Sequence, residues 1–301
     1  MKVGAVRTFL DLPSVTGLIG DATTITRLEG GSTKGVYRVT RAGGETVLVY
    51  RWHPDENFWP ARTAIDAGPF GGMPSQKDFL SRHEMLRALG VRVPDVLGLQ
   101  GDLALIEDVR GGKLEDHLDG DAAEGLLARL RTTLLTMHSH RGVPDGRPED
   151  HALERGRRSL AEAAHRVPEL AARRAAYEDV LTSRHAAVEP RDEAGLIHGE
   201  LGPDHVMVDD DGRPVLIDIE GTMFFDVEWE HAFLELRFGD LHEHLRTLEP
   251  DPARMRLYRL VMCLSLVAGP LLLVDGDFPR PEGMRQIAAW NLERVLLDVP
   301  G

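Results

Sequence analysis

The sequence predicts an α+β protein with two lobes, a small β-rich lobe over residues 1–109 and a larger, mainly helical lobe over residues 110–301. In the first third, short runs of β-branched and aromatic residues are separated by glycine-containing turns, as in antiparallel strands. From about residue 121 the apolar residues recur at helical spacing. One hairpin pattern near residue 210 interrupts the helical part.

The composition is that of a soluble globular protein, with 42% hydrophobic and 28% charged residues, and 301 residues suffice to bury a sizeable core. A net charge of −14 argues against non-specific binding to nucleic acid and is compatible with a cationic substrate. Arginine greatly outnumbers lysine, and we attribute this to a GC-rich coding bias. The lysines are Lys2, Lys34, Lys77 and Lys113.

The longest apolar run lies near residues 260–274, is interrupted by Gly269 and Pro270, and is shorter than the ~20 residues that span a bilayer. The first residues lack the apolar core of a secretory signal. A single cysteine, Cys263, excludes an internal disulfide and fits a reducing compartment. We therefore predict a cytoplasmic protein whose partners include neither a membrane nor a nucleic acid.

In the first lobe, three β-capable runs between residues 24 and 51 are joined by turns. The first turn, Gly30-Gly31-Ser32-Thr33-Lys34-Gly35, is rich in glycine, so its backbone N–H groups can cover nucleotide phosphates. An ordinary hairpin turn is an equally good interpretation. The third run alternates, which places Val47, Val49 and Arg51 on one face.

A helix containing Glu84 is predicted to begin at Ser75, because Asp78 completes an acidic variant of the capping box, and to end at Gly90. A buried-looking strand at 103–107 then leads into a charged linker that ends in glycine. The aromatic segment 52–74, which precedes the helix, is long for a loop. It is either a flap folded onto the small lobe or a substrate or dimer contact.

The densest group of chemically active side chains flanks the hairpin pattern, in which two apolar runs enclose the turn at 209–212. Glu200 and His205 precede the turn, and Asp218 follows it. Acids and an imidazole across a hairpin can hold a divalent cation and a nucleophile together. Phosphoryl transfer needs that arrangement, because most of its catalysis is positioning and charge neutralisation.

Helical patterns occupy most of the remaining sequence, at residues 126–140, 151–188, 226–238, 252–273 and 281–297. Two acids, Asp226 and Glu230, lie in the first turn of the third of these patterns. A favourable interaction with the helix dipole would by itself explain acids at that position.

One stretch resembles the catalytic and metal-binding loops of the small-molecule kinases related to aminoglycoside phosphotransferases and choline kinases. Their usual pattern is His-Gly-Asp-Leu-His-Pro-x-Asn, then a hairpin, then Ile-Asp-Phe/Trp-Gly/Glu. This chain differs from it at Glu200, where those kinases have Asp as the base, and at His205, where they have Asn as a metal ligand. The resemblance extends from about Ile25 to Phe238, and the matching residues are His198, Gly199, Leu201, Pro203, Ile217, Asp218 and Glu220.

The resemblance implies a bilobal protein-kinase-like fold and a role for each residue of the catalytic loops. Glu200 would accept or orient the proton of an acceptor hydroxyl, and His198 would support the loop. Asp218 would bind the metal that bridges the phosphates, helped by His205 or Glu220.

The resemblance also implies nucleotide-binding positions in the first lobe. The glycine-rich turn, through Gly30, Gly31 and Ser32, would cover the phosphates. Arg51 would contact the phosphates and pair with Glu84, although a solvent-facing Arg and a surface Glu remain the alternative. The carbonyl of Glu107 and the N–H of Val109 would bind adenine, while Asp226 and Glu230 would brace the catalytic loop and face the acceptor.

The reaction implied is transfer of a phosphoryl group from ATP, or another nucleoside triphosphate, to a hydroxyl of a small molecule. Mg²⁺ is the expected cofactor, and Mn²⁺ is a second candidate because imidazole suits softer metals. Aminoglycosides, other hydroxylated antibiotics, amino alcohols and sugars all fit as acceptors. The two departures at Glu200 and His205 keep a second hypothesis open, a nucleotide-binding sensor or pseudokinase without phosphotransfer activity.

Overall fold

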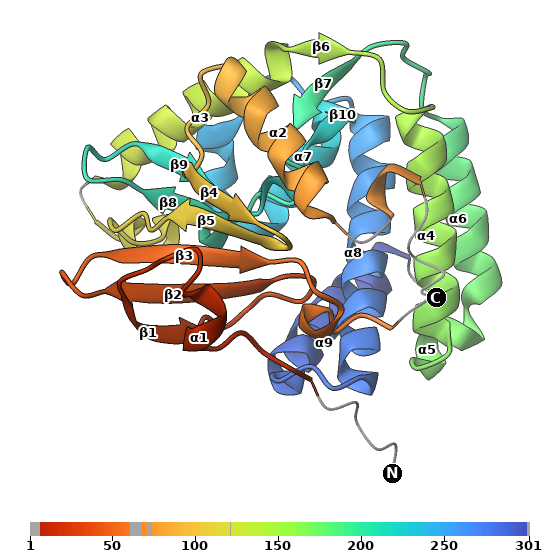
Figure 1. Cartoon of the computed structure of the whole chain (residues 1–301). Coiled ribbons are helices and arrows are strands. Elements are labelled where there is room, and N and C mark those ends of the chain that lie inside the picture. The colour runs from red at the N-terminus through yellow and green to blue at the C-terminus, as the bar shows by residue number, and fades with distance from the viewer. Residues whose placement is uncertain (1–6, 61–67, 72–73, 121, 300–301) are drawn as a thin grey trace. The chain divides into compact units, whose positions relative to one another are not determined.

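The computed structural model describes residues 7–60, 68–71, 74–120 and 122–299, and the chain divides into two compact units (Figure 1). The first unit contains residues up to 59, residues 74–112 and the hairpin segment 207–220. The remaining described residues form the second unit. The boundary at 112 is close to the expected one at 109, but the hairpin belongs to the first unit.

Backbone hydrogen bonds explain why the hairpin belongs to the first unit. The Val208 N–H donates to the Gly112 carbonyl at 2.9 Å, and the Leu216 N–H donates to the Arg92 carbonyl at 2.9 Å. Its two strands, β8 (Val206–Val208) and β9 (Pro214–Leu216), pair with each other as the sequence predicts. The hairpin is thereby tied to the linker that follows the first sheet.

The first unit is built on a five-stranded antiparallel sheet with the strand order β1-β2-β3-β5-β4 (Figure 1). All three β-capable runs between residues 24 and 51 form strands, and so does the buried run before the linker. The strands are β1 (Ala22–Arg27), β2 (Gly35–Arg41), β3 (Thr46–Arg51), β4 (Val96–Gln100) and β5 (Leu103–Glu107).

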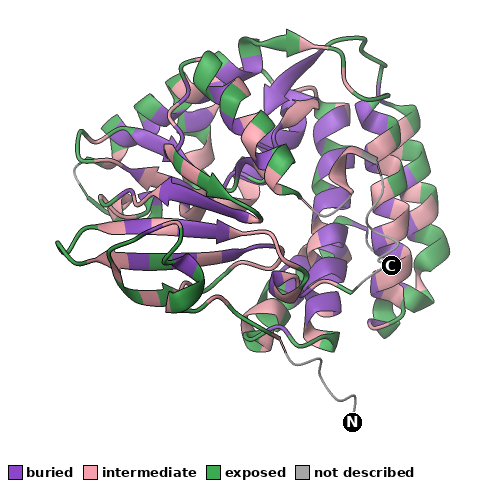
Figure 2. Cartoon of the chain, in the orientation of Figure 1, coloured by how far each residue is buried: buried purple, intermediate pink, exposed green. Residues whose placement is uncertain are grey.

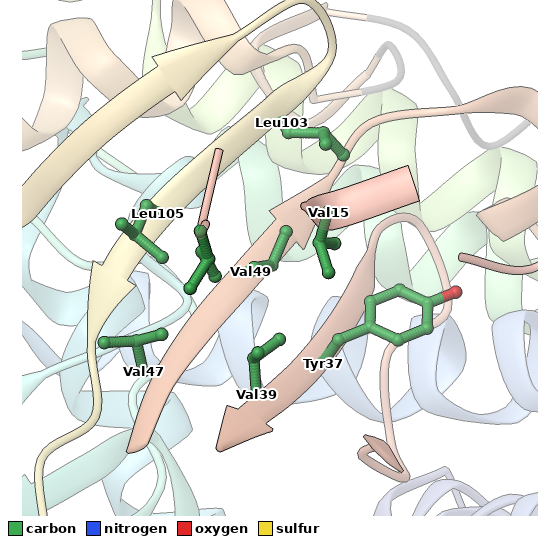
Figure 3. Packing of buried hydrophobic residues seen from close by; sticks show 8 residues of the cluster. Val15, Tyr37, Val39, Val47, Val49, Leu103 and Leu105 are labelled. Atoms are coloured by element: carbon green, nitrogen blue, oxygen red, sulfur yellow. The ribbon is translucent and has the colours of Figure 1, made fainter. Parts of the chain in front are cut away.

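One face of this sheet is covered by the short helix α1 (Leu12–Val15) and the chain that follows it (Figure 3). Val47 and Val49 of β3 lie on this face, as their alternation predicts. Burial of each such side chain stabilises the fold by about 1.5–3 kcal/mol relative to exposure. The buried cluster consists of Val15, Ile19, Tyr37, Val39, Val47, Val49, Leu103 and Leu105.

The opposite face of β3 meets helix α2 (Gln76–Ala88). Tyr50 packs edge-to-face on Phe79 of α2, with 5.6 Å between ring centroids. The helix begins as the sequence predicts, because Ser75 and Asp78 form a capping box. After the helix, Gly90 has a φ of 76°, a left-handed conformation that glycine adopts without strain.

The second unit is mainly helical and contains a small sheet of order β10-β7-β6. The strands are β6 (Arg141–Gly142), β7 (Ala194–Ile197) and β10 (Met223–Phe225). The predicted helical region 151–188 is divided into three helices. The helices are α3 (Ala123–Ser139), α4 (Pro148–Ala164), α5 (Pro168–Ala172), α6 (Arg174–Ala186), α7 (Val227–Phe238), α8 (Pro252–Asp275) and α9 (Pro281–Asp298).

Helix α8 is the centre of the second unit and packs against α4, α6, α7 and α9. Among the described residues it is the one helix long and apolar enough to cross a membrane, with a mean hydropathy of 2.0 over its most apolar window. However, 78% of that window is buried, and most of the helix is coloured as buried or intermediate in Figure 2. The run that looked too short for a membrane span is thus part of a 24-residue core helix.

Candidate active site

Asp218 lies just beyond the hairpin in an unusual backbone conformation. Among the described residues it is the one non-glycine residue with a positive φ, 59°. Such a conformation costs on the order of 1–3 kcal/mol and is found mostly at functional sites. Its side chain is 51% exposed, whereas that of Glu220, in the turn Ile219–Gly221, is 7% exposed. The chain therefore places one accessible and one buried carboxylate at the end of the hairpin.

The cation between these two carboxylates is Lys34 of the glycine-rich turn. Its Nζ lies 2.6 Å from Asp218 Oδ1 and 2.5 Å from Glu220 Oε1, and its side chain is 6% exposed. The ammonium also lies 5.1 Å from the ring centre of Tyr50. Burial alone would lower the pKa of Lys34, but the charges of Asp218 and Glu220 raise that pKa above its ordinary value, so the amine stays charged. Sequence reasoning assigned no functional role to Lys34.

The glycine-rich turn is tightly closed and braced. Gly30 has a φ of 115°, and a Cβ at Gly31 would overlap the carbonyl oxygen of Lys34. The Ser32 carbonyl accepts the Phe58 N–H at 2.9 Å, and the Ser32 hydroxyl accepts the Trp59 indole N–H at 3.0 Å. The start of the aromatic segment 52–74 thus packs against the turn, while residues 61–67 and 72–73 lie outside the described residues.

The expected pairing of Arg51 with Glu84 is wrong. Adjacent strand residues point to opposite faces, so Arg51 lies on the α1 side and Tyr50 on the α2 side of the sheet. The Arg51 guanidinium lies 3.6 Å from Glu56 and 3.5 Å from Asp102, and Glu84 is exposed on α2. Arg51 and Glu84 are separated by the sheet itself.

Glu56 is the acid that the sequence interpretation missed. It is fully buried, its carboxylate accepts a hydrogen bond from the Tyr37 hydroxyl, and it pairs with Arg27 at 3.1 Å. Together with Arg51 these contacts close the edge of the α1 face. Glu56 lies in the aromatic segment, where no periodicity marks a residue as buried.

The linker after β5 is fixed by side chains of the same unit. The Glu107 carboxylate accepts hydrogen bonds from Arg92 at 2.5 Å and from the Asp95 N–H at 2.9 Å. Val109 is buried. These contacts hold the segment in one conformation, and the adenine contacts of the Glu107 carbonyl and the Val109 N–H remain a prediction.

In the second unit, the loop expected to be catalytic, residues 198–205, follows β7 and is held by helix α7. The buried Glu230 carboxylate accepts the N–H groups of His198 at 2.5 Å and Gly199 at 3.3 Å. The Trp229 indole donates to the Gly199 carbonyl at 3.2 Å. Gly199 has a φ of 93°, and a Cβ there would lie 2.9 Å from the Gly221 carbonyl oxygen. Glycine is therefore required at this position.

The two acids of α7 have clear protein partners. Glu230 braces the catalytic loop, which is one of the two roles expected for this pair. Asp226 is 2% exposed, accepts a hydrogen bond from the Tyr258 hydroxyl, and lies 3.0 Å from the Arg254 guanidinium. Neither carboxylate is exposed. The contact with the acceptor that was expected of one of them stays a prediction.

Glu200 lies at the exposed tip of this braced loop. Its carbonyl accepts a hydrogen bond from His205 Nδ1 at 2.7 Å. The His205 ring stacks on buried His198, with 6.1 Å between centroids. Arg237 binds Asp204 at 2.6 Å. Burial would raise the pKa of Asp204, but His205 and Arg237 lower it below its ordinary value.

The three expected metal ligands belong to two different units. Among the described residues, no three His, Cys, Asp or Glu side chains are arranged to hold a metal ion. Asp218 and Glu220 are brought together in the first unit, whereas His205 belongs to the second. Two carboxylates that already surround an ammonium ion fit a hard divalent cation, because Mg²⁺ prefers oxygen ligands.

The sequence matches the model of the phosphotransferase enzyme family over residues 24–258. A search of curated protein sequences finds no match.

Three solved structures show the fold. A ternary complex of a thermostable mutant of aminoglycoside phosphotransferase APH(4)-Ia with ADP and hygromycin B is 18% identical, with a TM-score of 0.61 over 95% of this chain and 96% of that chain. Choline kinase LicA from Streptococcus pneumoniae is 14% identical, with a TM-score of 0.64 over 95% of this chain and 96% of that one. Spectinomycin phosphotransferase APH(9)-Ia, in complex with ADP and spectinomycin, is 11% identical, with a TM-score of 0.64 over 95% of both chains. These similarities confirm the expected protein-kinase-like fold.

Proposed function

Because this chain belongs to the phosphotransferase enzyme family, we propose that it transfers the γ-phosphoryl group of ATP to a hydroxyl of a small molecule in the cytoplasm. The observation that carries the proposal is the pair Asp218 and Glu220 around a cation, next to a glycine-rich turn. Phosphoryl transfer is catalysed mainly by positioned charges, and this unit supplies two carboxylates and one ammonium that can hold a metal and phosphates.

The metal-binding residue of this proposal is Asp218, with the Glu220 carboxylate beside it. Asp218 is the accessible ligand, because half of its side chain is exposed and its backbone is held in a costly conformation. When bound, Mg²⁺ or Mn²⁺ would neutralise the charge that develops on the transferred phosphoryl group.

The base of this proposal is Glu200. A general base must reach the acceptor hydroxyl within about 3 Å, and an exposed carboxylate on a fixed loop meets that need. Glu230 and Trp229 hold the backbone of the loop at His198 and Gly199. His198 is the buried residue on which the loop packs.

The acceptor is proposed to be a hydroxylated small molecule, and an aminoglycoside or another hydroxylated antibiotic is the first class to test. The support is the fold shared with kinases whose complexes contain hygromycin B or spectinomycin. The net charge of −14 favours a cationic acceptor through long-range attraction. Amino alcohols, as in choline kinase, are the second class.

The test combines a binding screen with a turnover assay. Thermal-shift measurements with hydroxylated cationic and neutral metabolites, each with Mg²⁺–ATP or Mn²⁺–ATP, identify acceptors that stabilise the chain. ADP release is then measured with each acceptor that binds, for the parent and for Glu200→Gln. Acceptor-dependent ADP release that Glu200→Gln abolishes supports the proposal. Nucleotide binding without ADP release across the whole panel contradicts it.

That contrary result would support a second candidate, a nucleotide-binding sensor without transfer. One observation favours it. The position between Asp218 and Glu220 already holds the Lys34 ammonium, which would compete with a metal ion. A sensor is expected to bind ATP equally well with and without Mg²⁺, and the same thermal-shift series with a chelator measures this difference.

A further inference from the structure

We propose that Lys34 contacts the phosphates of the bound nucleotide and that Glu220 holds it in place, so that the glycine-rich turn supplies the cation expected on β3. The inference rests on the proposed function and names the residue that recognises the phosphates. It replaces the pair of Arg51 and Glu84 by the pair of Lys34 and Glu220.

The strand β3 does not present a cation on the α2 side of the sheet. Arg51 points to the α1 face, where it contacts Glu56 and Asp102. The neighbouring position on the other face is Tyr50, an aromatic ring. Lys34 lies on the ring of Tyr50, at 5.1 Å from its centre, and so brings a positive charge to this face of β3.

The backbone of Lys34 is fixed from both sides. A Cβ at Gly31 would overlap the Lys34 carbonyl oxygen, and a Cβ at Gly35 would overlap the Glu56 carboxylate. Trp59 and Phe58 hold Ser32 within the same turn. The turn therefore has one conformation in which the lysine side chain points to the end of the hairpin. A surface lysine in a mobile loop would have no such support.

The two carboxylates differ in a way that divides their roles. Glu220 is 7% exposed and lies 2.5 Å from Lys34, so it forms the buried half of an ion pair. Asp218 is 51% exposed, so about half of its side chain is accessible from solvent. Together the three groups carry one net negative charge, so a divalent metal on Asp218 would leave a positive site for phosphate. Glu220 positions the ammonium, and Asp218 remains the metal ligand.

A phosphate contact predicts a selective loss of affinity. Lys34→Gln should weaken binding of ADP and ATP by about 10- to 100-fold, because charged hydrogen bonds are worth about that factor, and should leave adenosine affinity unchanged. The loss should persist with a chelator, since the contact does not pass through a metal. Asp218→Asn should weaken binding only when Mg²⁺ is present.

Two further variants separate recognition from folding. Lys34→Gln leaves Glu220 buried without its partner, so the double variant Lys34→Gln with Glu220→Gln restores charge balance and should show the same selective loss. Glu220→Gln alone should also weaken ADP binding, with little added effect in the double variant, because partners in contact are not additive. Lys77→Gln, on an exposed lysine of α2, is the matched control.

A chemical readout independent of activity completes the test. The lysine ammonium next to the phosphates first releases a proton to solvent, and its neutral amine then attacks the anhydride carbonyl of a nucleotide acyl phosphate. An amide forms, and the nucleotide leaves. With so few lysines in the chain, mass spectrometry can assign each site. We expect modification at Lys34 that ATP prevents, and no ATP-dependent modification at Lys77 or Lys113.

The outcomes are distinguishable. Equal losses for adenosine and ADP in Lys34→Gln, or labelling that avoids Lys34, would make its ion pair purely structural and overturn the inference while phosphotransfer stands. Absence of any nucleotide binding by the parent chain would overturn both the inference and the proposed function.

Discussion

Replacement of Glu230 by Gln should remove a large part of the pH dependence of stability. The Glu230 carboxylate is fully buried, and one of its oxygens accepts N–H groups of the catalytic loop. The other oxygen, Oε1, has no hydrogen-bond partner among the described residues. Burial raises the pKa of Glu230 from 4.5 to about 7, although the loop N–H groups lower it.

The raised pKa of Glu230 determines whether stability rises or falls with pH. The folded chain holds the Glu230 proton more tightly than the unfolded chain, so the stabilisation is complete below pH 4.5 and is lost as the pH rises through about 7. This titration corresponds to roughly 3 kcal/mol of unfolding free energy, a sizeable part of the stability of a typical domain. A glutamine keeps the accepting oxygen and carries no charge. Glu230→Gln should therefore be more stable than the parent at about pH 8 and similar to it at about pH 5.

The assay is urea unfolding followed by tryptophan fluorescence across this pH range. Glu249→Gln is the control, because the Glu249 side chain is 88% exposed and its neutralisation should not alter the pH dependence. Glu230→Ala should instead lose roughly 2–5 kcal/mol at every pH, because it leaves buried N–H donors without an acceptor. If Glu230→Gln keeps the pH profile of the parent, the carboxylate is not the titrating brace described here.

The remaining predictions concern the base, the first sheet and the buried histidines. Glu200→Gln should keep nucleotide affinity but lose about 10²–10⁴-fold in transfer rate, measured by ADP release. Glu200→Asp should also be slower if the loop is adjusted to the longer side chain. Equal rates for the parent and both variants would exclude Glu200 as the base. Arg51→Ala should destabilise the chain by about 1–3 kcal/mol in urea unfolding, and Glu84→Ala by less than about 0.5 kcal/mol. If both variants lose more free energy of ATP binding than of unfolding, the pairing of Arg51 with Glu84 at the phosphates would be correct after all. Burial lowers the pKa of His138 to about 3 and of His231 to about 4, so stability should fall as the pH drops below about 6.5. A neutral His231→Gln variant should show a shallower decline in acid unfolding, and an unchanged decline would refute this assignment.

The parts of the fold that were predicted correctly have local signals. Ser75 and Asp78 form the capping box that begins α2, and Gly90 follows the helix in a left-handed conformation. The turn at 209–212 joins the two strands of the hairpin. These features depend on residues within a few positions of one another, so the sequence alone identifies them.

The errors at the site have a different physical origin. Strand β3 is buried on both faces, since Val49 and Tyr50 are both inaccessible, so its pattern does not show which face meets α2. Arg51 was assigned to the wrong side for this reason. Lys34 and Glu56 act through partners far away in sequence, and no periodicity marks them. A lysine beside glycine, in a chain with so few lysines, was the one signal that pointed to Lys34.

The most direct test of the central claim is transfer of label from γ-³²P-ATP to an acceptor by Asp218→Asn. The parent should transfer label, and Asp210→Asn, a matched change of an exposed acid in the hairpin turn, should do so at the same rate. Asp218→Asn should fold normally and lose transfer by at least about 10³-fold, because the metal that neutralises the phosphoryl group loses its accessible ligand. Normal transfer by a folded Asp218→Asn chain would contradict the account.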